Sequence, residues 1–386
     1  MLKKRKLRVL FSSNAPWSTS GYGTQMHDLL PLIHKAGFPT GIVCFYGLEG
    51  GKIILDGITC YPKINDQWGG DAVTVFQNDF QADVVFTLQD IWVLNPQHLA
   101  QFKRWIPIVP IDHEPVPRPV FDRLKAAYRV VTYSQFGYDE LKRQGMHSTY
   151  IQHTVDTKIL TPRDKSEIRK RLSIPEDVFL FGMVAANKDN PPRKSFHAVL
   201  EAFKAFKEKH PKSALYVHTV TDQPSGFPIR EYAKFLGIAD SLYEISPLDM
   251  MFNVNRDGMA QIYSAMDCLL MPSTNEGFGV PAVEAQSCGV PVIVNNFTAM
   301  PELVAPGTGA VCEVDHKRFT PLLSYVAEPS VSSLLEKMEE VYAGDLKEQG
   351  KICRDFVTEN YDVHKIFTEK WLPFLQKLEK EVLAEA

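Results

Sequence analysis

The chain has 386 residues, of which 45% are hydrophobic and 23% charged, a composition typical of a soluble globular protein with two domains of ordinary size. The formal net charge of −4 argues against a nucleic-acid-binding protein that works by neutralising phosphates. A small anionic ligand is still compatible with it, because such a ligand needs only a local group of positive side chains.

The six cysteines lie far apart and form no C-x-x-C pair, so we expect buried free thiols and no structural zinc. The N-terminus, MLKKRKLRVLFSS, is basic, but its apolar run is too short for a signal peptide. No segment is long and apolar enough to cross a bilayer. We therefore expect a cytoplasmic protein, with contact to the cytoplasmic membrane surface left open.

In the first half of the chain, short apolar runs alternate with amphipathic segments, the pattern of parallel strands joined by crossover helices. The region between Gly47 and Gly70 is irregular and has room for a hairpin. Helices are predicted over 23–37 and 136–145, each with a terminal glycine. Strands are predicted over 7–13, 40–45, 82–88, 105–111, 128–134 and 148–155.

A polar, charged connector over 161–177 precedes a second series of the same kind. Its predicted strands are 178–185, 214–220, 243–247, 267–273, 291–296 and 309–314, and its predicted helices are 195–210, 230–237, 332–344 and 364–382. Two such series predict an α/β fold with two Rossmann-like doubly wound domains that face a central cleft. We expect the domains over 1–165 and 166–362, with the segment 363–386 as a helix that packs back on the first domain.

The segment 271–296, MPSTNEGFGVPAVEAQSCGVPVIVNN, is the most informative part of the sequence. A strand leads into a polar loop over 273–279, and a helix follows that has Pro281 in its first turn and Gly289 as its stop.

Gly277 and Gly279 allow the backbone of this loop to approach a ligand closely. The amides of Phe278, Gly279 and Val280 then form an anion site at a helix N-terminus. A diphosphate is the natural occupant of such a site.

Glu276 lies just before this anion site, and Glu284 lies one turn into the helix. A carboxylate accepts two hydroxyl hydrogen bonds, so the pair suits polyols on either side of a phosphate, a sugar and a ribose. The alternative is an ordinary strand–loop–helix with two solvated glutamates. Either glutamate alone favours that alternative, whereas both together, in register with the glycines, favour a binding site.

The pattern E-G-F-G-x-P-x-x-E, followed by A-x-x-x-G-x-P-V-I, resembles the E-x7-E signature of glycosyltransferase family 4, retaining enzymes with the two-domain B-type fold. The segments YSAMDCLLMPS, VVTYSQFGYDELKRQG and VDTKIL extend the resemblance over nearly the whole chain. It implies that Glu276 contacts hydroxyls of a donor sugar, that the loop amides hold the sugar and phosphate, and that Glu284 binds the ribose. The first domain would serve the acceptor and the second the nucleotide sugar.

The resemblance also implies that Lys194 neutralises the donor diphosphate. The family usually has an arginine several residues upstream, where this chain has Asn187, so we expect Arg193 to supply the missing charge. A solvated basic pair at the start of a helix is the alternative. The segment 245–255 is expected to hold the base through backbone contacts.

In the first domain, the resemblance places Gly21 against the donor phosphate, with Ser20 in place of the other glycine of the usual pair. His113 is expected to contact the donor sugar near the reacting carbon, with Asp112 or Glu114 to orient it or meet the acceptor. A histidine satisfied by local backbone is the alternative.

The implied reaction is transfer of a hexose, mannose or glucose, from a nucleotide diphosphate sugar with retention, with His113, Glu276 and Lys194 at the reacting centre. The acceptor would be a glycan, lipid-linked or small molecule, and GDP-mannose and UDP-glucose stay open as donors. The sugar nucleotide is a co-substrate, and we expect no cofactor and no metal, since the chain has no D-x-D pair. The alternatives are a sugar-nucleotide-binding protein without catalysis and an NAD-dependent oxidoreductase. The oxidoreductase is disfavoured because S-G-Y-G-T-Q lacks the third glycine of G-x-G-x-x-G.

Overall fold

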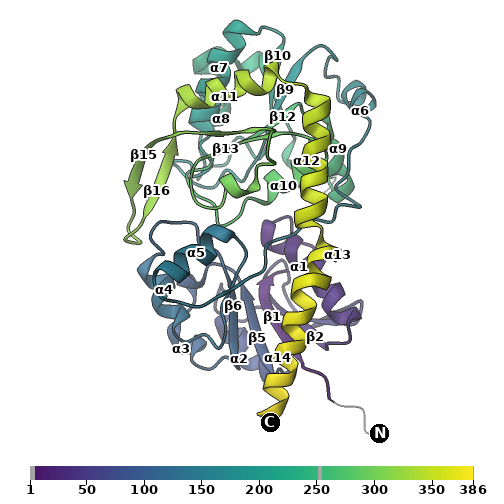
Figure 1. Cartoon of the computed structure of the whole chain (residues 1–386), viewed down its shortest axis with the longest axis vertical. Helices are drawn as coiled ribbons and strands as arrows, with labels where there is room; N and C mark the ends of the chain where they lie inside the picture. Colours follow the sequence, from purple (N-terminus) through teal and green to yellow (C-terminus); the bar gives the residue numbers. More distant parts are fainter. Residues whose placement is uncertain (1–4, 251–253, 386) are drawn as a thin grey trace. The chain divides into compact units, whose positions relative to one another are not determined.

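A computed structural model describes residues 5–250 and 254–385, and the chain divides into two compact units (Figure 1). Unit 1 contains the residues up to 154, residues 322–324 and the segment from Val363; unit 2 contains residues 155–321 and 325–362. Residues 251–253, part of the segment predicted to hold a base, lie outside the described residues, as do residues 1–4 of the basic tail.

Unit 1 is built on an eight-stranded sheet in the order β3-β4-β2-β1-β5-β6-β7-β8, with helices on both faces (Figure 1). The strands are parallel except where β3 pairs antiparallel with β4. Their bounds are β1 Val9–Asn14, β2 Thr40–Tyr46, β3 Ile53–Leu55, β4 Ile58–Pro62, β5 Val84–Leu88, β6 Trp105–Val109, β7 Val131–Thr132 and β8 Thr149–Tyr150. The helices of this unit are α1 Gly21–Lys35, α2 Gly70–Asp79, α3 Pro96–Leu99, α4 Arg118–Leu124, α5 Gln135–Arg143, α13 Val363–Ile366 and α14 Leu372–Ala384, with a π-helical turn at Phe367–Trp371.

The β3–β4 pair confirms the hairpin predicted between Gly47 and Gly70. Two other predicted strands are shorter than expected. Strand β7 ends early because the Ser134 hydroxyl accepts a hydrogen bond from Gly137 N and so begins α5. Beyond β8, the backbone of Thr154 is held by the side-chain amide of Gln25, whose two ends bond Thr154 N and O at 3.0 and 2.7 Å. A side chain thus replaces a neighbouring strand there.

Unit 2 has a six-stranded parallel sheet in the order β11-β10-β9-β12-β13-β14. Phenylalanine and aliphatic side chains of β9 and α7 fill its core, among them Phe181, Phe203 and Phe206. The strands are β9 Phe179–Val184, β10 Ser213–His218, β11 Leu242–Glu244, β12 Cys268–Met271, β13 Val292–Asn295 and β14 Ala310–Cys312. The helices are α6 Lys165–Arg171, α7 Phe196–Lys209, α8 Ile229–Leu236, α9 Arg256–Ala265, α10 Val280–Ser287, α11 Val331–Ala343 and α12 Leu346–Tyr361.

The strand order of unit 2 is the 3-2-1-4-5-6 order of doubly wound nucleotide-binding sheets, and six consecutive strands of unit 1, β4-β2-β1-β5-β6-β7, have the same order. The order reverses between β9 and β12 in unit 2 and between β1 and β5 in unit 1. Ligands of such sheets bind beyond the carboxyl ends of the strands at this reversal. The loops that follow these four strands are therefore the places to look for a site.

Several elements, among them α2, α4 and α9, were not among the predicted ones, and two further features were also missed. One is an antiparallel hairpin after β14, in which β15 Val314–Phe319 pairs with β16 Tyr325–Pro329. The other is α12, which forms in a charged stretch of the sequence. Strand β15 is exposed along nearly its whole length, so it carries none of the apolar alternation by which a strand is recognised.

The division between the units lies at residue 154, whereas the predicted boundary is at 165. The residues between positions 154 and 165 are bound into unit 2 by hydrogen bonds to their backbone. Val155 N donates to Tyr361 O at 2.9 Å, and Arg354 donates to the carbonyls of Thr157 and Leu160 at 2.7 and 2.8 Å. The polar composition of 161–177 reflects surface exposure in unit 2 and does not mark the domain boundary.

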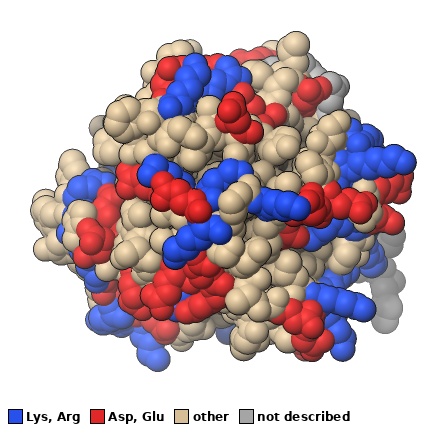
Figure 2. All heavy atoms as spheres, turned by 90° about the horizontal axis from the view of Figure 1, so that it is seen from above, with Lys and Arg blue, Asp and Glu red and all other residues tan. Residues whose placement is uncertain are grey.

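Within the described residues, no helix is long and apolar enough to cross a membrane. On the face drawn in Figure 2, basic and acidic side chains are intermixed, in agreement with the small net charge.

A buried ion pair in unit 2 provides a test of the fold. Arg169 donates to Asp267 Oδ2 at 2.6 Å, both side chains are less than a tenth exposed, and Leu180 N donates to the same oxygen at 2.7 Å. Asp267→Ala leaves a buried guanidinium unpaired, so we expect unit 2 to lose about 3–5 kcal/mol of unfolding free energy. Calorimetric melting should show this loss as a lower transition temperature. Asp177→Ala, which removes an exposed pair with Lys212, should leave the transition in place.

Candidate functional site

The loops after β9 and β12, at the reversal of strand order in unit 2, bring together three charged side chains. Arg193 and Lys194 come from the first loop, and Glu276 comes from the second. Lys194 Nζ bonds Glu276 Oε1, and Arg193 Nη1 lies 3.1 Å from Glu276 Oε2. Arg193 also donates to Asn275 O at 2.8 Å, so both cations are fixed against one loop.

The ion cluster of Arg193, Lys194 and Glu276 is largely removed from water. The side chains of Lys194 and Glu276 are 13% and 11% exposed, whereas that of Arg193 is 38% exposed. Burial favours the neutral form of Glu276, but Arg193 and Lys194 outweigh it and hold the pKa of this carboxyl at about 2. Burial and the neighbouring Arg193 lower the pKa of Lys194, against the opposing effect of Glu276. Within the ion cluster, two cations face one carboxylate, a surplus suited to an anion, and Asp189 adds a weaker interaction with Lys194 from outside the cluster.

The predicted anion site lies directly after Glu276 in the chain. Gly279 has φ +121°, and a Cβ atom there would come within 2.7 Å of Met271 Cε, so only glycine fits. Helix α10 begins at the next residue, Val280, and its N-cap residue, Gly279, has no side chain that could cap it. Phe278 is buried with its ring 5.8 Å from that of Tyr361, while Gly277 is half-buried. The packing of Phe278 anchors the loop at the start of α10.

Glu284 lies in the second turn of α10 and accepts a hydrogen bond from the Tyr263 hydroxyl at 2.8 Å. Burial, followed by the charge of Glu284, raises the pKa of Tyr263 well above its usual value, so the phenol stays a donor. Tyr263 thus fixes one carboxylate oxygen of Glu284. Sequence reasoning did not single out Tyr263, because an apolar helix face gives no signal for such a contact.

Thr298 is a second residue that the sequence did not reveal. Its hydroxyl accepts from Glu276 N at 3.2 Å and lies 2.9 Å from Glu276 O, so it fixes the backbone that carries the carboxylate. Thr298 has φ +53°, a strained conformation for a β-branched residue. The sequence offered one signal for Thr298, namely its place after β13, the strand that neighbours β12.

Asn187, at the position where the resemblance expects an arginine, is buried and binds backbone. Its side-chain oxygen accepts from Phe227 N at 2.7 Å, and its nitrogen donates to Phe227 O at 2.9 Å. Asn187 thus fastens the loop before α8, and the second cation beside Lys194 is Arg193.

In unit 1, Gly21 is the exposed first residue of α1. The hydroxyl of Ser20 caps this helix by accepting from Gly23 N at 3.1 Å. Gly23 is the glycine that packing requires, because a Cβ atom there would lie 2.2 Å from Ser18 Oγ. The start of α1 is therefore satisfied internally, unlike that of α10.

His113 follows β6 and is nearly buried, with its Nδ1 2.6 Å from Asp112 Oδ1. Of the two acidic neighbours, Asp112 is therefore the one that orients the ring, whereas Glu114 lies 4.0 Å from Arg143. Tyr22 reaches toward Asp90, which follows β5, at 3.5 Å. Burial first, then Asp90, raises the pKa of Tyr22. Asp90 is a member of this polar group that sequence reasoning missed.

Two other buried histidines have packing roles. Burial lowers the pKa of His153 to about 3, and its ring stacks on Tyr133 with centroids 3.7 Å apart. Burial lowers the pKa of His218 to about 4, and its Nδ1 lies 2.8 Å from the Tyr216 hydroxyl. Within residues 5–250 and 254–385, no group of three or more His, Cys, Asp or Glu side chains is arranged to hold a metal ion.

Comparison with known proteins now adds to this geometry. Residues 164–340, slightly less than half of the chain, match the family model described as "Glycosyl transferases group 1". The match is to glycosyltransferases. A D-inositol 3-phosphate glycosyltransferase of Actinosynnema mirum is 31% identical over 42% of this chain and 39% of the relative. A GDP-mannose-dependent mannosyltransferase of Corynebacterium glutamicum, which acts on a monoacylated phosphatidylinositol monomannoside, is 29% identical over 48% of this chain and 49% of the relative. The aligned part thus spans about half or less of these relatives.

Solved structures are similar over almost the whole chain. A sucrose-phosphate synthase of Thermosynechococcus elongatus has a TM-score of 0.77 at 15% identity and covers 99% of this chain and 100% of its own. Anabaena Alr3699/HepE in complex with UDP and glucose has a TM-score of 0.69 at 15% identity, with coverage of 98% and 100%. These likenesses confirm the predicted fold class, two α/β units of the B-type glycosyltransferase fold.

The low pKa of Glu276 gives a direct test of the ion cluster. Because this pKa lies below the ordinary value of 4.5, the ionised carboxylate stabilises unit 2 above about pH 4.5. That stabilisation is lost as the pH falls toward 2. We expect one glutamate resonance, in protein labelled at the side-chain carboxyl carbon, to stay ionised at pH 4 and to be missing in Glu276→Gln. If the resonance lost in this variant titrates near pH 4.5, Glu276 is not paired with Arg193 and Lys194.

Proposed function

We propose that this protein is a retaining family 4 glycosyltransferase that transfers a hexose from a nucleotide diphosphate sugar to a hydroxyl acceptor. The observation that carries the proposal is the ion cluster of Arg193, Lys194 and Glu276 beside the uncapped N-terminus of α10. The match of residues 164–340 to glycosyltransferases and the fold of the whole chain support it.

Glu276 holds both cations in the unliganded protein, and its carboxylate stands where a diphosphate would be attracted. On donor binding, Arg193 and Lys194 would turn to the diphosphate, and the loop amides of 277–280 would bind it from the other side. This exchange frees Glu276 to accept hydrogen bonds from the donor sugar. Binding of the leaving group would thus ready the carboxylate for the sugar.

The same cations would stabilise the leaving group. In a same-face displacement, the bond from the anomeric carbon to the diphosphate oxygen breaks and a bond from that carbon to the acceptor oxygen forms. The departing diphosphate takes the proton of the acceptor hydroxyl. Charge grows on the diphosphate as this happens, and Arg193, Lys194 and the N-terminus of α10 are placed to stabilise it. These groups would do the work of a metal ion, so we infer that the reaction needs neither metal nor cofactor.

The polar group of unit 1 would serve the sugar and the acceptor. His113 Nδ1 is engaged by Asp112, so Nε2 is the ring nitrogen that would contact a sugar hydroxyl. Gly21, exposed at the start of α1, is the proposed contact to the donor phosphate in this unit.

We infer that the donor is GDP-mannose or UDP-glucose, and the names of the similar proteins favour this pair. The acceptor class is a glycan, a lipid-linked molecule or a small molecule, and the proposed location is the cytoplasm. A sugar-nucleotide-binding protein without catalysis would keep the donor site and lack turnover. An NAD-dependent oxidoreductase stays disfavoured, because S-G-Y-G-T-Q at the start of α1 lacks the third glycine of G-x-G-x-x-G.

A panel of UDP-, GDP- and ADP-sugars tests the donor. We expect one of them to raise the melting temperature, equally with and without EDTA, and Lys194→Ala to abolish the shift because the diphosphate loses its buried cation. Lys188→Ala, an exposed change in the same loop, is the matched control and should respond like the wild type. A response to NAD alone would sink the proposal. Donor binding without release of nucleotide with any acceptor would establish the non-catalytic alternative.

Glu276→Gln separates the two tasks of the site. We expect this variant to bind the nucleoside diphosphate at least as well as the wild type, because its cations no longer face a competing carboxylate. Transfer should fall by about a hundredfold or more. Calorimetry with the nucleoside diphosphate and a nucleotide-release assay measure the two effects. Loss of binding and transfer in equal proportion would contradict the exchange of partners.

The role of Glu284 is tested with a modified donor. Glu284→Ala should weaken binding of the nucleoside diphosphate by about tenfold, the loss of one charge-assisted hydrogen bond. It should not change binding of the 2′,3′-dideoxy analogue, which has no ribose hydroxyl to offer. An equal loss for both nucleotides would show that Glu284 acts by holding α10 and Tyr263 together.

A further inference from the structure

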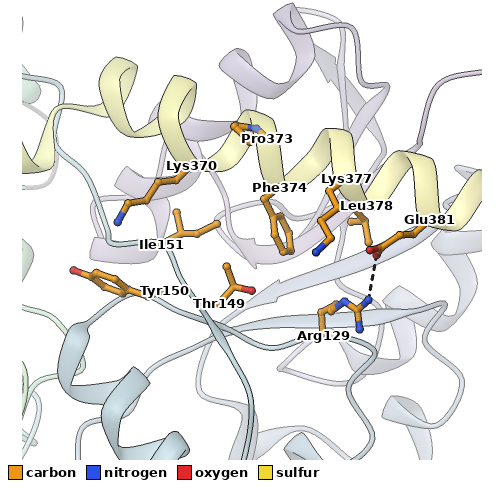
Figure 3. A pocket seen from close by; sticks show the side chains of 10 residues that line it. All are labelled: Arg129, Thr149, Tyr150, Ile151, Lys370, Pro373, Phe374, Lys377, Leu378 and Glu381. Atoms are coloured by element: carbon orange, nitrogen blue, oxygen red, sulfur yellow. Dashed lines mark hydrogen bonds and ion pairs between the residues drawn. The ribbon is translucent and has the colours of Figure 1, made fainter.

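A groove on unit 1, separate from every residue of the candidate site, has the character of a second binding site (Figure 3). It lies between α14 with the π-helical turn before it and residues 149–151 of the sheet edge. Its volume is about 450 Å³, within the range of about 300–1,000 Å³ of small-molecule sites.

The walls of the groove are apolar. Ile151 and Leu378 are almost fully buried at its base, and Phe374 and Tyr150 present half-buried rings. Figure 3 shows the ring of Phe374 between the two ends of the groove. An apolar chain or ring that lay there would remove this surface from water.

The groove carries more positive than negative charge. Three basic side chains and one carboxylate line it, which leaves a surplus of two positive charges. Arg129 is occupied by Glu381 at 3.1 Å, so the surplus belongs to Lys370 and Lys377. Exposed lysines are common, but these two flank an apolar surface, and that combination selects an amphiphile of negative charge.

Lys370 is held in place. Its ammonium donates to Gln152 Oε1 at 2.5 Å and lies 4.4 Å from the centre of the Tyr150 ring. Burial lowers its pKa, against the opposing effect of Glu369. These contacts leave ammonium hydrogens for a further acceptor, since a lysine has three.

The helix has an irregular conformation at Lys370. Residues Phe367–Trp371 form a π-helical turn, a rare feature that is frequent at functional sites. The turn widens the helix directly before α14, Leu372–Ala384, in which Pro373 is the second residue. It sets Lys370 at one end of the groove while Phe374 and Lys377 line the rest.

We propose that this groove binds an amphiphilic anion, a phosphate or carboxylate head at Lys370 or Lys377 with an apolar chain against Phe374, Ile151 and Leu378. This goes beyond the glycosyl transfer inferred above, and it requires none of the donor-site residues.

Calorimetry with dodecyl phosphate below its micelle concentration tests the proposal on the full chain. Dodecyl maltoside, which has the same chain and no charge, and inorganic phosphate, which has no chain, are the control ligands. We expect dodecyl phosphate to bind at least tenfold more tightly than either. Lys370→Gln with Lys377→Gln should weaken its binding at least tenfold, and Phe374→Ala should weaken it while the charges stay.

Lys380→Gln, an exposed change on the same helix outside the groove, is the matched variant and should bind like the wild type. Melting temperatures show whether the double variant folds, and Lys377→Gln alone replaces it if it does not. Equal binding of the charged and neutral detergents, or equal weakening by Lys380→Gln, would overturn the proposal. So would inorganic phosphate binding as tightly as dodecyl phosphate.

Binding to lipid vesicles shows whether the amphiphile is a membrane lipid or a soluble molecule. If vesicles with phosphatidylglycerol bind the wild type but not the double variant, and phosphatidylcholine vesicles bind neither protein, the amphiphile is a membrane lipid. If only dodecyl phosphate distinguishes the variants, the amphiphile is a soluble one. A transfer assay run beside these measurements keeps failure of the groove distinct from failure of the proposed reaction.

Discussion

The buried carboxylate of Glu276 is the constraint around which unit 2 is organised. A carboxylate with little exposure is tolerated only with partners, and it has two cations from the loop after β9. This requirement ties two loops together at the reversal of strand order. Thr298 fixes the backbone of Glu276, and Asn187 fastens the neighbouring loop, so the ion cluster stands on a rigid base. The cluster is in turn matched to an anion, since it holds one more positive charge than negative.

The two units share a strand order but differ at the helix that would meet a phosphate. In unit 2, α10 starts after Gly279. The positive φ of this residue and its closeness to Met271 both require a glycine, which has no side chain to cap the helix. In unit 1, Ser20 caps α1 and is itself held by Asn14 at 2.7 Å. The positive end of α10 is therefore available to a ligand, whereas that of α1 is satisfied within the protein. This difference explains why the diphosphate is assigned chiefly to unit 2.

The sequence predicted the parts of the molecule that depend on local pattern. The buried parallel strands, the E-x7-E spacing and the glycines of the loop over 273–279 are visible because they are contiguous. Thr298 and Tyr263 were not predicted, because each acts on a residue that only the fold brings near. Strand β8 was overestimated for the same reason, since Gln25 takes the place of a neighbouring strand at Thr154. The cap at Ser20 is local, since Gly23 lies three residues further along the chain, and it was simply not recognised. Strand β7 was overestimated because the local cap of α5 by Ser134 was not recognised.

The strained backbone of Thr298 has a consequence for protein engineering. A glycine would adopt its φ of +53° without strain, so a search for stabilising substitutions would select Thr298→Gly. That substitution would also remove the hydroxyl that holds Glu276 at both its N–H and its carbonyl. At this position thermal robustness and a well-placed carboxylate are opposing design goals. A thermostable version of this protein should therefore draw its gains from elsewhere and keep the threonine.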